Sequence, residues 1–295
     1  MHEDQVDVTV DIVRRLVADQ FPQWRELRVR EVVSEGTVNA IYRIGDGLAA
    51  RFPLRSQAPA EARAVLEREA DASRELAEVS PVPTPRPVAL GAPGDGYPLP
   101  WAVQTWLPGR VATVEDPSGS VAFAEDLAAF IAALRAADTR GRRFSGAGRG
   151  GHLPDHDDWM DLCFERSSGL LDVDRLRSVW QDLRRLPRVG PDMMCHGDLV
   201  PGNVLVRDGR LVGVLDAGGF GPADPALDLV AAWHLLEPSP RKVLRDALGC
   251  DELEWRRGAA WAFQQAMGLV WYYATSNPSM SRLGKRTLER LLAEV

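Results

Sequence analysis

Three polar side chains stand at fixed spacing around the stretch CHGDLVPGNVLV, residues 195–206. Asp198 and Asn203 lie five residues apart, and a Pro-Gly pair between them favours a sharp bend. An apolar run follows, then the turn pair Asp208-Gly209, then a second apolar run that ends at Asp216. Asp-Gly between two such runs is typical of a β-hairpin, which brings Asn203 and Asp216 to the same end of two antiparallel strands. We therefore expect the three side chains to converge.

The three side chains offer oxygen atoms, and no cysteine pair or second histidine stands at metal-binding spacing beside them. Oxygen ligands favour a hard cation, Mg²⁺ rather than zinc. Mg²⁺ held by few protein ligands usually brings phosphate groups with it. Isolated Asp and Asn residues are common in turns, but the joint spacing H-G-D-x-x-x-x-N, a hairpin and D-x-G is specific. The pattern indicates phosphate chemistry assisted by Mg²⁺.

Residues 196–203 resemble the catalytic loop of the aminoglycoside phosphotransferase family, antibiotic kinases that are similar to protein kinases in fold. Residues 216–218 resemble the metal-binding segment of that family, and residues 221–229 resemble its following G-x-x-D-P-x-x-D-L stretch. The resemblance implies that Asp198 orients the substrate hydroxyl and accepts its proton. It also implies that Asn203 and Asp216 hold Mg²⁺ against the phosphates of ATP or GTP.

Three other polar residues of this region are interpreted as structural. His196 is expected to anchor the catalytic loop by hydrogen bonds rather than act as a base. Asp224 followed by proline is typical of a helix N-cap with proline in the first turn. Asp228, one turn further on, is expected to bond back to the catalytic loop.

An independent observation comes from the helix expected over residues 60–79. At 100° per residue, Glu69 falls in the middle of its apolar stripe, where an unpaired carboxylate is unfavourable. Kinases pair such a glutamate with a basic residue on the third strand, and the matching residue is Arg51 in LAARF. Lysine is more common at that position. The planar guanidinium of Arg51 can still hold both phosphate and carboxylate.

Two further segments are assigned to the nucleotide by the same resemblance. The turn between the first two strands contains Ser34, Gly36 and Thr37 and resembles the loop that covers the phosphates, where backbone N–H groups meet an anion. The segment around Thr105 and Leu107 matches the hinge, whose backbone pairs with the purine edge.

Periodicity predicts the elements that must position these residues. We expect strands over 27–33, 38–44, 48–52 and 101–107, besides the hairpin. Helices are expected over 8–20, 60–79, 121–138, 157–170, 172–186, 225–236 and 252–275. The fold class is therefore α+β, a bilobal protein-kinase-like fold. A small antiparallel-sheet lobe, residues 1–107, would bind the nucleotide, and a larger, mainly helical lobe, residues 108–295, would carry catalysis and the acceptor.

Composition narrows the class of partners. The chain has 295 residues and a formal net charge of -7, which disfavours nucleic acid and anionic membranes. Three cysteines without paired spacing and the absence of an apolar leader predict reduced thiols in a cytoplasmic protein. No apolar stretch reaches the ~20 residues that span a bilayer. We expect a monomer or a weak dimer that binds a nucleoside triphosphate and a small-molecule acceptor.

The acceptor is left open by the residues of the helical part. An acidic cluster around Trp159, residues 155–165, suits a polycationic aminoglycoside, and it is also typical of a solvated helix start. Aromatic residues over 261–273 suit an apolar acceptor such as a macrolide or a nucleoside antibiotic, or are simply core. We expect phosphoryl transfer to a hydroxyl of an antibiotic. The alternatives are a metabolic kinase acting on an amino alcohol or sugar derivative, and a regulatory pseudokinase.

Overall fold

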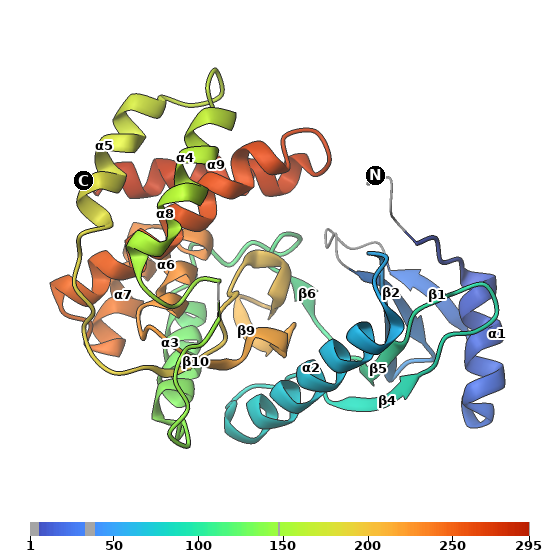
Figure 1. Ribbon diagram of the computed structural model, residues 1–295. Coiled ribbons are helices and arrows are strands. Elements are labelled where there is room, and N and C mark those ends of the chain that lie inside the picture. The colour runs from blue at the N-terminus through green and yellow to red at the C-terminus, as the bar shows by residue number, and fades with distance from the viewer. Residues whose placement is uncertain (1–5, 33–38, 147, 295) are drawn as a thin grey trace. The chain divides into compact units, whose positions relative to one another are not determined.

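The computed structural model describes residues 6–32, 39–146 and 148–294. The chain divides into two compact units (Figure 1). The first comprises the described residues up to 78, residues 83–108 and the short segment 214–218. The second comprises residues 79–82, 109–213 and 219 onward. The division of nucleotide binding to residues 1–107 and of catalysis and acceptor binding to residues 108–295 stays a prediction.

The first unit is built on a five-stranded antiparallel sheet in the order β1-β2-β3-β5-β4. Its strands are β1 (Val29–Val32), β2 (Asn39–Ile44), β3 (Leu48–Pro53), β4 (Pro87–Gly91) and β5 (Trp101–Thr105). Its helices are α1 (Val10–Gln20) and α2 (Pro59–Val79). Strand β4 was not expected, because it begins within the proline-rich segment that follows α2.

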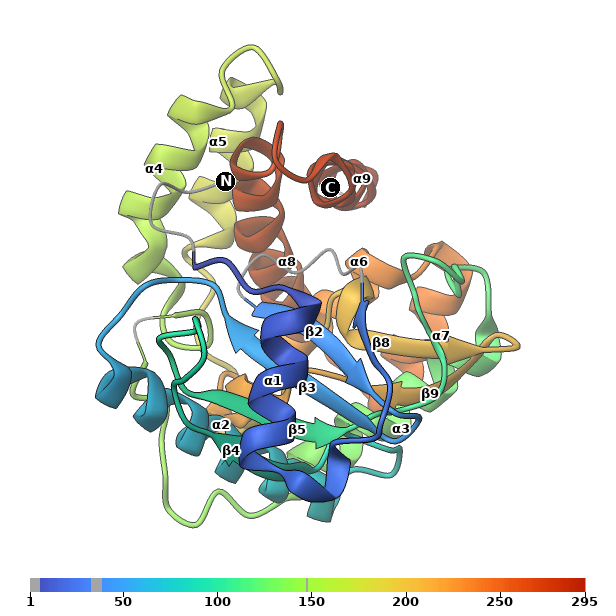
Figure 2. The same cartoon turned by 90° about the vertical axis from the view of Figure 1, so that its right-hand side faces the viewer.

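Alternation along β3 gives the two faces of this sheet different tasks. Ala50 and Phe52 are fully buried and pack with the apolar side of α1, which crosses this face (Figure 2). Arg51 lies between them in sequence and therefore points to the opposite face. There it meets Glu69 of α2. One face thus forms the core of the unit, and the other presents a charged side chain.

The second unit is mainly helical and carries two small sheets, β6-β8-β9 and β10-β7. Its helices are α3 (Val121–Ala136), α4 (Asp157–Arg166), α5 (Val173–Leu183), α6 (Val230–Leu235), α7 (Pro238–Leu248), α8 (Glu252–Tyr272) and α9 (Pro278–Leu292). Its strands are β6 (Arg110–Val111), β7 (Met193–Cys195), β8 (Val204–Arg207), β9 (Arg210–Val214) and β10 (Gly221–Ala223). The hairpin of β8 and β9 turns at Asp208, whose φ of 52° is left-handed.

Helix α8 is the centre of this unit. It contacts α4, α5, α6 and α9, and it is buried without interruption from Ala260 to Val270 (Figure 1). Its start is capped by Asp251, whose side chain accepts the backbone N–H of Glu254 at 2.8 Å. A helix buried on all sides belongs to the interior of a domain. The polar residues that α8 carries must therefore find partners inside the protein.

Sequence and structure agree on the fold class and differ over several elements. The helix expected over 225–236 begins only at Val230, after a 3-10 turn over Leu227–Leu229. Helices α7 and α9 were not expected. All three cysteines are free and buried. Within the described residues, no helix is both long and apolar enough to cross a bilayer.

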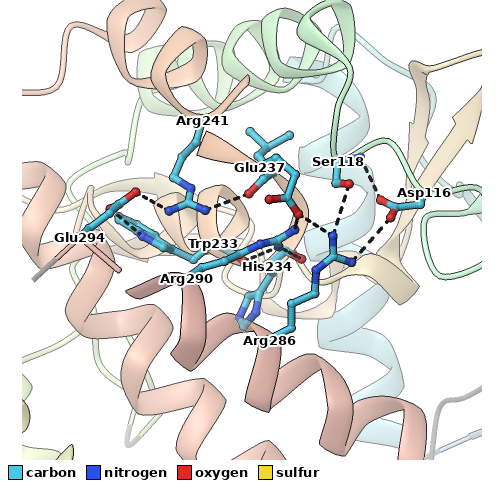
Figure 3. A network of polar contacts seen from close by, with 10 residues as sticks. Asp116, Ser118, Trp233, His234, Glu237, Arg241, Arg286, Arg290 and Glu294 are labelled. Carbon is cyan, nitrogen blue, oxygen red and sulfur yellow. Dashed lines mark hydrogen bonds and ion pairs between the residues drawn. The ribbon is translucent and has the colours of Figure 1, made fainter. Parts of the chain in front are cut away.

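A network of charged side chains fastens α9 to α6 and α7 (Figure 3). Arg290 of α9 donates to Glu237 Oε1 at 2.5 Å and to the backbone oxygens of Trp233 and His234 at 2.8 and 3.2 Å. Arg286, one turn earlier, also donates to Glu237 Oε1, at 2.6 Å. The hydrogen bonds from Arg290 and then Arg286 lower the pKa of Glu237 to about 2. The C-terminal helix is thereby tied to the segment that carries His234.

This network predicts a component of acid sensitivity. Because the pKa of Glu237 is below its ordinary value of 4.5, its stabilising effect is complete above pH 4.5 and is lost as pH falls through about 2. Glu237 is 43% exposed, so solvent screens the pairs, and we expect Glu237→Gln to lower the free energy of unfolding by about 1 kcal/mol at neutral pH. Urea unfolding should show the difference shrinking below pH 4.5. The exposed Glu165 of α4 supplies the control Glu165→Gln. A difference in unfolding free energy between wild type and Glu237→Gln that did not change with pH would contradict the lowered pKa of Glu237.

Candidate active site

A buried carboxylate fixes the start of the predicted catalytic loop. Asp228 accepts the backbone N–H groups of His196 and Gly197, each at 2.8 Å, as the sequence predicts. Asp228 is 1% exposed, and burial raises its pKa while His196 and the two N–H groups act in the opposite direction. Gly197 has a φ of +84°, a backbone conformation that residues other than glycine rarely adopt. These contacts fix the backbone between the end of β7 and Asp198.

The neighbouring Asp224 does not cap a helix, contrary to expectation. It is fully buried and forms an ion pair with Arg257 of α8, whose Nε donates to Oδ2 at 3.0 Å. Trp261 Nε1 donates to the same oxygen at 3.0 Å. The expectation failed because Pro225 is followed by turns rather than by the first helical residues. Through these contacts, Asp224 joins the segment after β10 to α8.

Asp198 lies at the centre of a set of polar contacts within the second unit. Its Oδ1 accepts Gln265 Nε2 at 3.0 Å and Arg149 Nη2 at 2.9 Å. Its Oδ2 accepts Asn203 Nδ2 at 2.9 Å. The backbone N–H of Asp198 donates to His196 Nδ1 at 3.3 Å, so His196 does anchor the loop. A carboxylate offers about four lone-pair directions, and three are occupied, which leaves one on Oδ2.

Asn203 lies at the end of a 3-10 turn over Pro201–Asn203, immediately before β8. Its amide nitrogen donates to the backbone oxygen of Asp198 at 3.0 Å as well as to the carboxylate. Because the nitrogen is directed to Asp198, the amide oxygen Oδ1 points away from it. That oxygen is a suitable ligand for a hard cation.

In the first unit, Arg51 holds two carboxylates. Its Nη2 lies 3.1 Å from Asp216 Oδ1, and its Nη1 lies 3.6 Å from Glu69 Oε2. Burial raises the pKa of Glu69, and the guanidinium of Arg51 opposes that shift. Asp216 has a φ of +56°, which is left-handed and strained for a residue other than glycine. The expected pair of Arg51 and Glu69 is present, and its role at a nucleotide stays a prediction.

The remaining predicted nucleotide contacts are less defined. Ser34, Gly36 and Thr37 lie outside the described residues. At the predicted hinge, the backbone N–H of Thr105 donates to Arg86 O at 2.9 Å. Within the described ranges, the backbone N–H of Leu107 has no such partner. Roles for these residues in purine binding stay predictions.

Two residues beside Asp198 were not predicted to belong to the site. Arg149 lies in the glycine- and arginine-rich stretch 139–151, and Gln265 lies in α8. The backbone oxygen of Gly150 accepts the N–H of Asp224 at 2.8 Å, which fixes the chain next to Arg149. One sequence signal for Gln265 exists, because two consecutive glutamines interrupt the apolar stretch AWAFQQAMGLV. Buried amides need partners.

An aromatic surface adjoins the end of α8. The ring of Trp159 lies directly over Gly268, where a Cβ atom would come within 2.8 Å of it, and its centroid is 5.8 Å from that of Trp271. Trp159 is 36% and Tyr272 is 37% exposed. At 1.5 Å rise per residue, Tyr272 lies roughly 10 Å along the helix from Gln265 and on the same side of it. Trp261 and Phe263, by contrast, are fully buried core.

The acidic cluster around Trp159 is partly neutralised within the protein. Asp157 accepts Trp180 Nε1 at 3.0 Å and Arg184 Nε at 2.7 Å, and these hydrogen bonds hold its pKa below the ordinary value although burial acts in the opposite direction. Asp161 pairs with Arg177 at 2.5 Å. Asp155 and Asp158 are exposed. Two of the five acids are therefore structural.

Solved structures share this fold, which combines a small antiparallel-sheet unit with a mainly helical unit. The structure titled the GDP complex of aminoglycoside 2'-phosphotransferase-IIIa matches with a TM-score of 0.70 at 19% identity, over 98% of this chain and 100% of that chain. Macrolide 2'-phosphotransferase MphH from Brachybacterium faecium matches with a TM-score of 0.63 at 19% identity, over 94% and 98%. These likenesses define the fold, which is the α+β, protein-kinase-like one expected from the sequence.

The family follows from the sequence itself. Residues 29–261 match the family described as "Phosphotransferase enzyme family", and the chain belongs to that family. An aminoglycoside 3'-phosphotransferase of Escherichia coli is 28% identical over 199 residues, which cover 60% of this chain and 66% of the relative. Another match covers 30% of its relative. The chain thus spans about a third to two thirds of the length of these curated relatives.

The contacts of Asp228 predict a structural effect that reaches the catalytic loop. In Asp228→Asn, only one side-chain oxygen remains to accept the N–H groups of His196 and Gly197. The new NH₂ group then faces one of these donors and cannot accept it. We expect a loss of about 2 kcal/mol in the free energy of unfolding, the scale of an unsatisfied buried group. Asp208→Asn is the matched control, since asparagine tolerates the left-handed turn position of that exposed residue. Equal urea midpoints for the two variants would contradict the assignment.

Proposed function

We propose that this protein transfers the γ-phosphoryl group of ATP or GTP to a hydroxyl group of an antibiotic. The observation that carries the proposal is the carboxylate of Asp198, held on Oδ1 by Gln265 and Arg149 and on Oδ2 by Asn203. The remaining direction on Oδ2 accepts the hydrogen of the acceptor hydroxyl. The hydroxyl oxygen forms a bond to the γ-phosphorus, the bond to the β-phosphate oxygen breaks, and the proton passes to Asp198.

Mg²⁺ fits the residues that the resemblance assigns to it. Asn203 keeps its amide oxygen, and Asp216 keeps the carboxylate oxygen that does not contact Arg51. Both are hard oxygen ligands of the kind that Mg²⁺ prefers. When bound, the ion neutralises charge on the phosphates of the donor. Arg51, fixed by Glu69, supplies a planar cation for those phosphates in the position where lysine is more common.

Arg149 is proposed as the cation for the transferred group. The residues between Asp198 and Asn203 are Leu-Val-Pro-Gly and contain no positive charge. Arg149 Nη2 lies within 2.9 Å of Asp198 Oδ1 and 3.2 Å of Gly197 O, next to the atom that receives the proton. Negative charge on the equatorial oxygens of a transferring phosphoryl group is stabilised by such a guanidinium.

The acceptor is proposed to lie beside Asp198, toward the exposed rings of Trp159 and Tyr272 at the end of α8. Aromatic rings pack against the nonpolar faces of sugars and of macrocycles, and they also attract ammonium groups. Asp155 and Asp158 are exposed nearby in sequence and add negative charge. These features support a sugar-bearing antibiotic, and the similarity to aminoglycoside 3'-phosphotransferases adds support for an aminoglycoside.

A panel assay tests the proposed reaction. Purified protein with Mg²⁺ and either ATP or GTP should release nucleoside diphosphate in the presence of one class among aminoglycosides, macrolides, nucleoside antibiotics, amino alcohols and sugars. Asp198→Ala should reduce turnover at least ~10²-fold, the scale of a lost general base, while nucleotide binding persists. Release of nucleoside diphosphate only with an amino alcohol or a sugar would show that the acceptor is a metabolite and not an antibiotic. Binding of nucleotide without transfer to any acceptor would contradict the proposal.

The role of Arg149 is tested separately. Arg149→Ala should lower kcat about 10²-fold, as expected for loss of a donor to the transition state, with a small change in KM for the acceptor. Guanidinium ions added to this variant should restore part of the activity. Arg143→Ala removes an exposed arginine of the same stretch and is the matched control. Equal activity of the two variants would remove Arg149 from the mechanism.

A further inference from the structure

A line of buried hydrogen bonds runs from α9 to the carboxylate of Asp198. Thr287 Oγ1 of α9 lies 2.9 Å from His234 Nδ1, His234 Nε2 lies 3.1 Å from Gln265 Oε1, and Gln265 Nε2 donates to Asp198 Oδ1 at 3.0 Å. Thr287, His234 and Gln265 are 0%, 3% and 7% exposed. Thr287, His234 and Gln265 are not among the residues assigned above to nucleotide or metal.

The direction of each hydrogen bond in the line follows from chemistry. Asp198 offers only acceptors when ionised, so the amide nitrogen of Gln265 faces it and the amide oxygen faces His234. That oxygen requires a donor, which assigns the hydrogen of the ring to Nε2 of His234. Nδ1 is then bare and accepts the hydroxyl hydrogen of Thr287. Every donor therefore points toward Asp198, and successive bonds polarise one another.

His234 is suited to this task because its ring stays neutral. Burial lowers its pKa to about 4, so a single ring hydrogen is present at neutral pH. Its backbone is also fixed, since Arg290 donates to the carbonyl oxygens of Trp233 and His234 (Figure 3). A ring held at its backbone and at Nδ1 has little freedom to turn away from Gln265.

We propose that His234 is a positioning residue whose Nε2–H tautomer, selected by Thr287, fixes the amide of Gln265 so that Oδ1 of Asp198 is occupied and Oδ2 is left for the acceptor hydroxyl. The inference rests on the proposed phosphoryl transfer for its kinetic consequence. If the amide of Gln265 turned over, its oxygen would face the carboxylate and repel it. Asp198 would then rotate, and displacement of a reacting group by about 1 Å can reduce the rate about 10²-fold.

A matched pair of variants separates positioning from packing. In His234→Gln, the amide nitrogen is as many bonds from Cβ as Nε2 is in histidine, so it can still donate to Gln265. In His234→Asn, the amide is one bond shorter and reaches only toward Thr287. We expect His234→Gln to retain most of the wild-type kcat and His234→Asn to lose it about 10- to 100-fold, with KM for the nucleotide unchanged in both. Thermal unfolding midpoints measure the packing loss of each variant.

The outcomes decide between the two roles. If His234→Gln and His234→Asn lost kcat only to the extent that each lost stability, His234 would serve packing alone. That result would overturn the inference. Thr287→Ser keeps the hydroxyl and Thr287→Val removes it, so the first should resemble wild type and the second should lose kcat.

A spectroscopic measurement decides the tautomer without any substrate. Nitrogen-15 NMR of the imidazole rings of the wild-type protein should show His234 protonated at Nε2 and bare at Nδ1. Protonation at Nδ1 would overturn the inference whatever the activity. If no acceptor is phosphorylated while the Nε2–H tautomer is observed, the proposed function fails and the positioning of Gln265 by His234 stands.

Discussion

The second unit depends on the burial of two carboxylates, which lie six and two residues before the start of α6. Asp224 and Asp228 are 0% and 1% exposed, and a buried negative charge must be matched by donors. Asp228 takes its donors from the backbone of the catalytic loop, and Asp224 takes them from Arg257 and Trp261 of α8. The short segment that carries both residues therefore joins the loop to the central helix. Loss of either carboxylate leaves buried donors unmatched.

Helix α8 brings several of the polar contacts near Asp198 together. Arg257, Trp261, Gln265 and Gly268 recur at spacings of four, four and three residues, which place them along one side of a helix. The first two hold Asp224, the third holds Asp198, and the fourth gives space to the ring of Trp159. One helix thus sets the positions of Asp224, of the carboxylate of Asp198 and of the ring of Trp159. Rigid elements position reacting groups more accurately than loops do.

Local spacing was sufficient to predict much of the fold and part of the site. The contact of Asn203 with Asp198 could be predicted from their five-residue spacing and the Pro-Gly bend between them. The pair of Arg51 and Glu69 could be predicted because Glu69 lies on the apolar stripe of its helix. Arg149 and Gln265 were not predicted, because they reach Asp198 only through the folding of segments 49 and 67 residues away. Single-sequence periodicity carries no information about such distances. The helices α7 and α9 begin with proline, which marks a helix start as readily as a turn.

The left-handed backbone of Asp216 restricts how its charge can be studied. Alanine at a φ of +56° is strained by about 1 kcal/mol, since its Cβ approaches the following carbonyl oxygen. Removal of the side chain would therefore disturb the local backbone as well as remove the proposed metal ligand, so a loss of activity would have two causes. Asparagine tolerates this conformation and preserves the shape of the side chain. Asp216→Asn is consequently the substitution that separates electrostatics from conformation at this position.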